Sequence, residues 1–244
     1  MWHVKRELKK GKAIMLYLID PSNYACHRQD LDNMYRLRDR VFRQSLNWDV
    51  KSEDGMEKDE YDEKDAYYIV YKDKQGVIRG CHRLIEMTNR CMFDGPFKFV
   101  LPNFKEFKRP GYWEVSRFAV DYNFDENYTR KDAQKVFLAL IAANIHFGLE
   151  VAKVEAFLCI TYPAFGKRIA QSGLVLSSLK NCTINNESIV ISAYSPLRFS
   201  YEKLLKNLGH NFDDPILYYT GPMYANDDTV FRFNENRHAR MGSF

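Results

Sequence analysis

An arginine within the apolar face of a helix is the sequence feature that most constrains this chain. Between positions 31 and 46 apolar residues recur at steps of three and four, which predicts a helix with one core-facing stripe. The stripe consists of Leu31, Met34, Leu37, Val41, Phe42 and Leu46. At about 100° per residue Arg38 falls near the centre of this stripe, whereas Arg36, Arg40 and Arg43 fall on the polar side. Either Arg38 reaches the edge of the core, or it is buried and needs carboxylate partners.

The segment after this helix supplies candidate partners for Arg38. Its acidic residues are Asp49, Glu53, Asp54, Glu57, Asp59, Glu60, Asp62, Glu63 and Asp65. An acidic run is usually a solvated loop, but Trp48 stands before it and Gly55-Met56 interrupts it. We therefore expect the segment to fold over an opening and to offer selected carboxylates to Arg38. Trp48 is either an aromatic wall for a flat or cationic ligand or part of the core.

A second unusual pattern lies in the sequence WEVSRFA at 113–119, which reads as a β-strand. Strict alternation places Glu114, Ser116 and Phe118 on one face. Arg117 falls on the other face and reaches the side of Glu114 only through a β-bulge. Ionisable residues on both faces fit a half-exposed edge strand, or, together with Arg38 and the acidic segment, one buried polar site.

The rest of the chain alternates strands and helices. Strands are predicted over 13–19, 66–72, 77–86, 154–160, about 174–180, 187–194 and 216–220. Helices are predicted after a capping box at 129–132, over 163–173 and over 197–208, and 91–112 is irregular. This order predicts a single α/β domain over 1–220, an αβα sandwich with a mixed, mostly antiparallel sheet. The polar stretch 221–244 reads as an extended or disordered tail.

Several functional classes are disfavoured by composition. A net charge of +4 and a pI near 8.6 without a dense Lys/Arg run do not indicate nucleic-acid binding. Five cysteines without C-x-x-C spacing, and histidines without H-x-x-x-H, indicate neither a disulfide framework nor a metal site. Cys81 and His82 are neighbours on a predicted strand and point to opposite faces, so they form no nucleophile pair. The apolar run near the N-terminus is too short for a signal peptide or membrane span, and we expect a cytoplasmic protein.

The order of elements resembles that of GNAT-type N-acyltransferases. A member that uses coenzyme A should carry a glycine-rich loop between the central strand and the next helix, where backbone amides hold the pyrophosphate. Here that junction reads DYNFDENYTRKD and has no glycine. The absence disfavours a coenzyme A donor.

Four motifs in order resemble those of the acyl-homoserine-lactone synthases, the LuxI-type autoinducer synthases. They are LRDRVF with NWDV at 37–50, MEKDEYD at 56–62, GCHRL at 80–84 and WEVSRFA at 113–119. The resemblance implies a GNAT-like fold and an enzyme that draws its acyl group from acyl carrier protein. That enzyme transfers the group to the amine of S-adenosylmethionine, a substrate rather than a cofactor, and closes the lactone with release of methylthioadenosine.

The resemblance also implies the site residues. Carried over motif by motif, the set that binds adenosylmethionine or forms its charge network is Arg38, Phe42, Trp48, Asp59, Asp62, Arg83, Ser116 and Arg117. Glu114 is the expected general base that takes a proton from the attacking amine. The acyl pocket is expected at Cys159, Thr161, Phe137 and Leu140, within a tunnel also lined by 97–107. Cys159 stands where several 3-oxoacyl-using members have threonine, so the oxidation state of the chain stays open.

Acyl carrier proteins are acidic, so a basic docking patch is expected, with Lys98, Lys105, Lys108 and Arg109 as candidates. Two rival functions remain at this point. One is a GNAT-like N-acyltransferase that uses acyl-coenzyme A and another amine. The other is a non-catalytic module that binds adenosylmethionine or a carrier protein.

Overall fold

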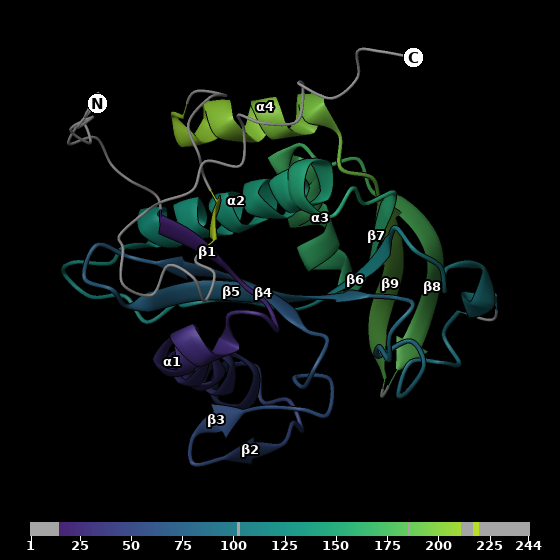
Figure 1. Ribbon diagram of the computed structural model, residues 1–244, viewed down its shortest axis with the longest axis horizontal. Coiled ribbons are helices and arrows are strands. Elements are labelled where there is room, and N and C mark those ends of the chain that lie inside the picture. Colours follow the sequence, from purple (N-terminus) through teal and green to yellow (C-terminus); the bar gives the residue numbers. More distant parts are fainter. Residues whose placement is uncertain (1–14, 102, 185, 211–216, 220–244) are drawn as a thin grey trace, which may run out of the picture.

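The computed structural model describes residues 15–101, 103–184, 186–210 and 217–219 (Figure 1). Within these residues one eight-stranded sheet has the order β10-β1-β4-β5-β6-β7-β9-β8. Its strands are β1 Met15–Ile19, β4 Tyr67–Lys72, β5 Ile78–Glu86, β6 Tyr112–Val120, β7 Ala156–Thr161, β8 Ser177–Ile184, β9 Glu187–Tyr194 and β10 Leu217–Tyr219. The pairs β1–β10 and β6–β7 are parallel, and the other neighbours are antiparallel. The predicted mixed, mostly antiparallel sheet is confirmed.

Helices cover both faces of this sheet (Figure 1). The helices are α1 Arg28–Arg38, α2 Arg130–His146, α3 Pro163–Ser172 and α4 Arg198–Leu208. Short helical turns lie at Tyr24–His27 and Phe104–Glu106, and π-helical segments extend α1 over Asp39–Ser45 and α2 over Phe147–Val151. On the α1 face, a small hairpin of β2 Ser52–Glu53 and β3 Met56–Glu57 carries the acidic segment. On the opposite face lie α2 and α3, and α4 covers α2 from outside, which confirms the predicted αβα arrangement (Figure 1).

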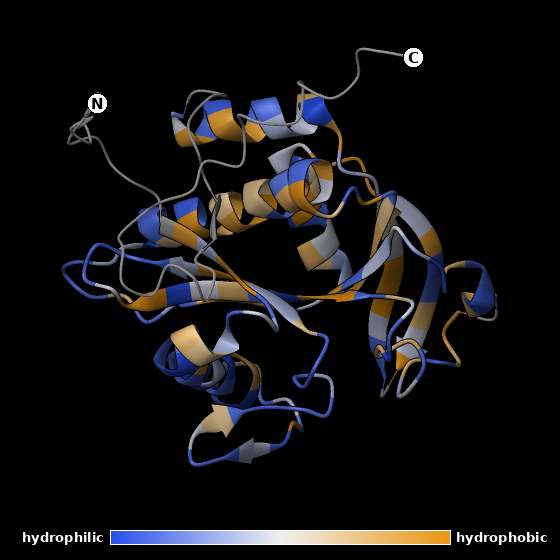
Figure 2. Ribbon diagram, in the orientation of Figure 1, coloured by the Kyte–Doolittle hydropathy of each residue, from blue (hydrophilic) through white to orange (hydrophobic). Residues whose placement is uncertain are grey.

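The central helix α2 begins at the predicted capping box. The hydroxyl of Thr129 accepts a hydrogen bond from the Asp132 amide, and the Asp132 carboxylate accepts from the Thr129 amide in return. The helix Arg130–Val151 is long and apolar enough to cross a membrane. Here its apolar residues pack between the sheet and α4, as a core helix does. Figure 2 shows this concentration of hydrophobic residues on α2 and the inner strands, while the loops around β2 and β3 are mostly hydrophilic.

The parallel strands β6 and β7 separate partway along their length. Their pairing runs from Tyr112 opposite Ala156 to Val115 opposite Cys159 and goes no further, although β6 continues to Val120. The sheet therefore opens beyond Val115, where the second half of β6 has no β7 partner. In the sequence, loop 121–129 directly follows β6, and the first turn of α3 directly follows β7.

Most predicted element boundaries agree with the structure. The hairpin 66–86, the irregular segment 91–112 and helices 163–173 and 197–208 lie where the sequence placed them. The prediction for β8 began three residues early, because Leu174 to Leu176 connect α3 to the strand rather than pairing with β9. The polar stretch 221–244 lies outside the described residues.

Close packing of α2 on the sheet gives the first prediction. A Cβ atom on Gly80 of β5 would lie 2.6 Å from Val136 Cγ1 and 2.9 Å from Leu140 Cδ1. We expect Gly80→Ala to lower the free energy of unfolding by about 1–3 kcal/mol through overpacking, measured by urea titration. The double variant Gly80→Ala/Val136→Ala should regain part of that loss. A Gly80→Ala protein as stable as the parent would contradict this close approach.

Candidate active site

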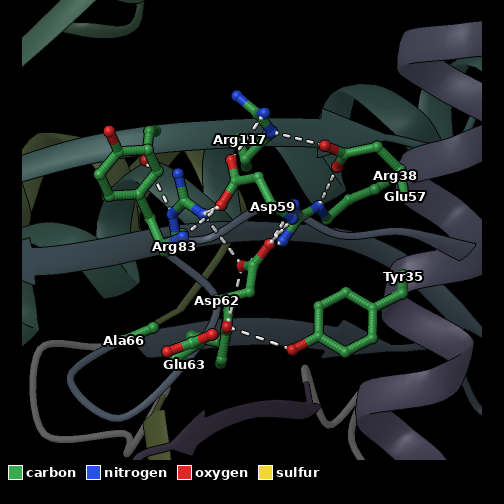
Figure 3. Close-up of polar contacts among 12 residues, drawn as sticks. Tyr35, Arg38, Glu57, Asp59, Asp62, Glu63, Ala66, Arg83 and Arg117 are labelled. Carbon is green, nitrogen blue, oxygen red and sulfur yellow. Dashed lines mark hydrogen bonds and ion pairs between the residues drawn. The ribbon is translucent and has the colours of Figure 1, made fainter. Parts of the chain in front are cut away.

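The guanidinium of Arg38 is buried and paired with carboxylates. Its Nε lies 2.6 Å from Glu57 Oε2, and its Nη1 and Nη2 each lie 2.7 Å from an oxygen of Asp62. All three side chains are fully buried. The two parallel bonds to Asp62 form the bidentate geometry that suits an arginine and a carboxylate. The buried interpretation of Arg38 is therefore confirmed, with partners from the acidic segment as predicted (Figure 3).

Two further arginines reach the same carboxylates from the sheet. On β5, Arg83 places Nη1 2.5 Å from Asp59 and 3.0 Å from Asp62. On β6, Arg117 pairs with Glu57 at 3.0 Å and with Asp59 at 2.7 Å. Three guanidinium groups and three carboxylates thus balance in formal charge, with the carboxylates between the arginines (Figure 3). Such mutual pairing offsets the cost of removing each charge from water.

The carboxylate of Asp62 lies at the centre of this network. Besides the two arginines, it accepts hydrogen bonds from the Asp59 amide (2.9 Å) and from the Tyr68 hydroxyl (2.9 Å). The hydroxyl oxygen of Tyr35 in turn lies 3.2 Å from the hydroxyl oxygen of Tyr68. Burial alone would raise the pKa of Asp62, but the charges of Arg38 and Arg83 outweigh it and hold that pKa well below its usual range. Asp62 is therefore ionised at any working pH.

A β-bulge in β6 brings Arg117 into this network. Cys81 pairs with Ala119 and Arg83 pairs with Ser116, so two β6 residues oppose the single residue His82. Arg117 takes a left-handed backbone conformation with φ of 53°. Its side chain points to the α1 face, and Phe118 turns to the α2 face, where it contacts Phe137 and Phe165. Strict alternation placed Arg117 and Phe118 wrongly, and the bulge that Arg117 was expected to need is present.

The predicted base Glu114 lies on the same face of β6, next to Arg83 and beneath the irregular segment. It is 2% exposed, and its Oε2 accepts a hydrogen bond from the Met92 amide at 2.8 Å. Burial raises the pKa of Glu114, while the charge of Arg83 and the hydroxyl of Ser116 oppose the rise. Ser116 also accepts a hydrogen bond from Arg83 Nε at 3.1 Å. A carboxylate with a raised pKa is a stronger base than an exposed one.

Besides the Tyr61 hydroxyl and Asp59 Oδ2, which is ion-paired with Arg117, two buried polar atoms at this face have no hydrogen-bond partner among the described residues. They are Oε1 of Glu114 and Nη2 of Arg83. A buried polar group without a hydrogen bond is costly and usually marks a place where a ligand binds. One acceptor and one cationic donor, both fixed by their remaining contacts, suit a ligand that carries an amine and a carboxylate.

Aromatic side chains border the same region on its helical side. Phe42 and Trp48 stack with ring centroids 5.0 Å apart and planes 11° apart. Trp48 is partly buried and also approaches Tyr162, at the start of α3, within 6.1 Å. Arg117 lies 5.8 Å from the centroid of Phe42. Phe42, Trp48 and Tyr162 thus lie in one row of aromatic rings. Tyr162 reaches this row from the junction of β7 and α3.

The loop that carries Trp48 is held by a buried aspartate. Asp39 begins the π-helical segment, is 1% exposed and accepts hydrogen bonds from Arg43, Gln44 and Ser52. The hydrogen bonds from Arg43 and the other donors lower the pKa of Asp39 to about 2 despite its burial. Asp39 precedes Trp48 in the chain and Ser52 follows it. The hydrogen bond from Ser52 to Asp39 therefore joins the two ends of the loop that carries Trp48.

The predicted acyl-pocket residues lie on the α2 face. Cys159, Phe137 and Leu140 belong to one buried cluster, and Thr161 shares the face of Cys159 on β7. The Oγ1 atom of Thr161 is buried and has no partner among the described residues. Segment 97–107 packs instead against the opposite face of β7, at Leu158, because successive strand residues point to opposite faces. The two expected tunnel walls therefore lie on opposite faces of the sheet.

Sequence reasoning missed several contributors to the site. Glu57 was one of nine acidic residues in its segment, and the sequence offered no way to choose it. Tyr68 and Tyr162 carried no signal, because an aromatic residue on a strand or before a helix is usually part of the core. The Met92 amide belongs to an irregular segment whose path no pattern predicts. Among the described residues, no group of three or more His, Cys, Asp or Glu side chains is arranged to hold a metal ion.

The chain matches known proteins along most of its length. The profile of the autoinducer synthase family matches residues 22–203. An acyl-homoserine-lactone synthase of Vibrio anguillarum is 29% identical over 174 residues, covering 70% of this chain and 89% of that protein. One from Aliivibrio fischeri is 32% identical over 138 residues, covering 55% of this chain and 72% of that protein.

Solved structures share the fold. The CoA-dependent acyl-homoserine lactone synthase BjaI, with SAM and isopentyl-CoA, has a TM-score of 0.73 and 24% identity, covering 86% of this chain and 95% of its own. The synthase LasI has a TM-score of 0.66 and 23% identity, covering 80% and 96%.

Fold and family together define an acyltransferase with a GNAT-like sheet, open between two parallel strands and with a buried glutamate, Glu114, on the central strand. The chain belongs to the autoinducer synthase family, the group to which the acyl-homoserine-lactone synthases belong. The resemblance seen in the four sequence motifs is confirmed.

The charge network gives the second prediction. We expect Arg38→Met to lower the free energy of unfolding by about 3–5 kcal/mol, because Glu57 and Asp62 lose their buried partner. The low pKa of Asp62 stabilises the fold above the unfolded-state pKa of about 3.9 and that stabilisation is lost as the pH falls. The deficit of the variant, measured by urea titration, should therefore shrink below about pH 4.

A matched control for this variant is Arg109→Met. Arg109 pairs with Glu155 on the surface, where both side chains are more than half exposed. Its removal should leave stability almost unchanged. Equal losses in the two variants would show that the buried network contributes nothing beyond a surface pair.

Proposed function

We propose that the protein transfers an acyl group from acyl carrier protein to the amine of S-adenosylmethionine and then closes the homoserine lactone, releasing methylthioadenosine. The product is a quorum-sensing signal. The observation that carries this proposal is the pair of unpartnered buried atoms, Glu114 Oε1 and Arg83 Nη2, on one face of the sheet. The reaction uses S-adenosylmethionine as a substrate and no cofactor, and we place it in the cytoplasm, where these substrates are made.

Adenosylmethionine would lie between the aromatic wall and the charge network. Its sulfonium cation suits the faces of Phe42 and Trp48, with Tyr162 extending the wall toward α3. Its methionine carboxylate suits the free Nη2 of Arg83. Arg38, Asp59, Asp62 and Arg117 would shape this pocket as a rigid, charge-balanced support.

Acyl transfer requires a neutral amine. Glu114, directly or through a water molecule, would accept a proton from the substrate ammonium, and its raised pKa suits that role. The amine nitrogen then attacks the thioester carbon, and the thiol of the donor leaves. Beyond Val115 the backbone of β6 has no β7 partner, so N–H groups on that side of the strand, away from β5, would stabilise the oxyanion.

Lactone formation follows on the acylated product. The carboxylate oxygen of the methionine moiety attacks its own γ-carbon, the bond from that carbon to sulfur breaks, and methylthioadenosine leaves as a neutral thioether. A sulfonium is an excellent leaving group, so this step requires mainly that the two reacting atoms be held close. Arg83 would place the carboxylate for that attack.

The start of α2 favours a carrier protein over coenzyme A as the donor. In the coenzyme A-dependent layout this helix N-terminus binds the pyrophosphate. Here the capping box occupies the amides of Thr129 and Asp132, and the Asp132 carboxylate adds a negative charge where phosphate would approach. The junction also lacks glycine. BjaI is described as CoA-dependent, so coenzyme A as donor is the runner-up within this family.

The acyl chain would enter where β6 and β7 separate. On the α2 face, Cys159, Thr161, Phe137 and Leu140 would line its path, and the Thr161 hydroxyl, which has no partner among the described residues, suits a polar substituent near the thioester. On the opposite face lies the apolar cluster of segment 97–107 and Leu158. The rest of both clusters would serve as ordinary core.

Of the four basic residues expected to dock the carrier, two are better suited than the others. Lys98 and Lys105 are exposed and form no ion pair among the described residues, and Phe99 beside Lys98 is 61% exposed. Lys108 is paired with Asp94 and Arg109 with Glu155, so their charges are already partly neutralised. Two free cations beside an exposed aromatic suit an acidic partner with an apolar contact surface.

The third prediction tests the reaction. Purified protein incubated with adenosylmethionine and a panel of acyl carrier proteins should yield both methylthioadenosine and an acyl-homoserine lactone, detected by mass spectrometry. Glu114→Gln should lower kcat by about 100- to 10,000-fold, whereas Glu155→Gln, an exposed control, should leave it unchanged. The acid limb of the pH–rate profile should lie above the usual range of a glutamate, because activity needs the ionised base.

Parallel reactions with acyl-coenzyme A of the same chain length decide the donor. A higher kcat/KM with coenzyme A would overturn the carrier proposal and leave the synthase reaction standing. Neither product with any donor, from protein shown to be folded, would overturn the synthase proposal itself.

The fourth prediction concerns the docking patch. Lys98→Glu/Lys105→Glu should raise KM for the acyl carrier protein about tenfold or more, because it replaces two attractive charges with repulsive ones. The KM for adenosylmethionine should stay the same. Lys206→Glu on α4 is a control, since this lysine is exposed on the far side of α2. An unchanged carrier KM in the double variant would exclude the patch.

A further inference from the structure

His82 is a buried polar residue that the proposed reaction does not use. It is fully buried on the α2 face of β5 and is the single residue opposite the bulge at Arg117 and Phe118. Its ring stacks on the Phe118 ring with centroids 5.6 Å apart and planes 7° apart. A histidine in the core costs more than an apolar residue of the same size, so its presence here calls for a physical reason.

A chain of hydrogen bonds fixes the plane of the imidazole. The Tyr194 hydroxyl on β9 donates to Asn144 Oδ1 at 2.9 Å. The amide nitrogen of Asn144 on α2 therefore faces His82 and donates to Nε2 at 3.4 Å. Burial lowers the pKa of His82 to about 3, so the ring stays neutral. Because Nε2 accepts from Asn144, the ring proton is on Nδ1, which is buried and has no hydrogen-bond partner among the described residues. The ring thus has a fixed orientation relative to three elements of the fold.

The bulge itself needs support from both faces of the sheet. A residue other than glycine in the left-handed region costs about 1–3 kcal/mol and persists only where its surroundings enforce it. On the α1 face, Glu57 and Asp59 hold the guanidinium of Arg117. On the α2 face, the adjacent Phe118 is held by the His82 stack and by edge contacts with Phe137 and Phe165.

We propose that His82 is a positioning residue: its imidazole, oriented by Asn144 and Tyr194, holds the Phe118 ring and thereby keeps Arg117 in the conformation that delivers its guanidinium to Glu57 and Asp59. A smaller or non-planar residue at 82 lets the bulge relax toward regular alternation. In that arrangement Arg117 leaves the carboxylates and Phe118 leaves its aromatic partners. His82 acts through the backbone of β6 and touches neither substrate.

The test combines a stability measurement with turnover. His82→Leu removes the flat ring, and His82→Phe keeps the ring but not the hydrogen bond to Asn144. The control is Leu84→Ala, a fully buried residue on the same face of β5, opposite Val115 in regular pairing. Arg117→Ala is combined with each of these changes, and urea midpoints and kcat are measured for every protein.

We expect coupling between positions 82 and 117 across the sheet. Arg117→Ala should shift the urea midpoint less in the His82→Leu background than in the parent, because Arg117 has already lost its contacts. It should shift the midpoint equally in the Leu84→Ala and parent backgrounds. The kcat per folded molecule should fall about 10- to 100-fold in His82→Leu, less in His82→Phe and not in Leu84→Ala.

Additive midpoint shifts for His82→Leu and Arg117→Ala, with kcat equal to that of Leu84→Ala, would overturn the proposal and leave His82 an ordinary core residue. The turnover part rests on the proposed function, whereas the stability part does not. A parent protein with no synthase activity would therefore overturn the function and leave the coupling of positions 82 and 117 measurable.

Discussion

The rest of the site depends on the need to pair a buried arginine. Once Arg38 lies in the apolar stripe of α1, its charge has to be met by carboxylates from elsewhere in the chain. The acidic segment meets it by folding under the sheet, where Glu57 and Asp62 reach the guanidinium. Those carboxylates then attract Arg83 and Arg117 from two neighbouring strands. Electrostatic pairing thus joins a helix, an otherwise polar loop and the centre of the sheet into one rigid surface beside Glu114.

The same pairing accounts for a departure from regular strand geometry. Alternation along β6 would send Arg117 into the apolar core beneath α2, at a cost of several kcal/mol for an unpaired charge. A bulge costs about 1–3 kcal/mol for the left-handed residue and returns the charge to its partners. It also turns Phe118 into the aromatic cluster, where an apolar ring is favoured. Comparison of these two costs explains why the bulge occurs at this residue.

Much of the fold could be predicted from the sequence, because periodicity, turn residues and the capping box at Thr129 are local signals. Arg38 and its need for carboxylates could be predicted for the same reason. The choice of Glu57 among nine acidic residues, the tyrosine beneath Asp62 and the approach of Tyr162 to Trp48 could not. Each depends on which distant segments the fold brings together. The sequence also does not reveal that segment 97–107 and Cys159, both expected at the acyl pocket, lie on opposite faces of β7.

The open end of the sheet is where the proposed acyl donor would approach. Separation of β6 and β7 leaves one side of β6 without a strand partner beyond Val115, and an apolar cluster packs on each face of the sheet. Donor choice is then left to surface features outside this core, chiefly the first turn of α2 and the segment 97–109. In this chain the capping box of Thr129 and Asp132 places an internal carboxylate at that first turn, and on the other segment Lys98 and Lys105 form no ion pair among the described residues. An internal carboxylate at a helix N-terminus disfavours phosphate binding there, and this is the physical argument behind our proposal that the donor is recognised through a protein surface.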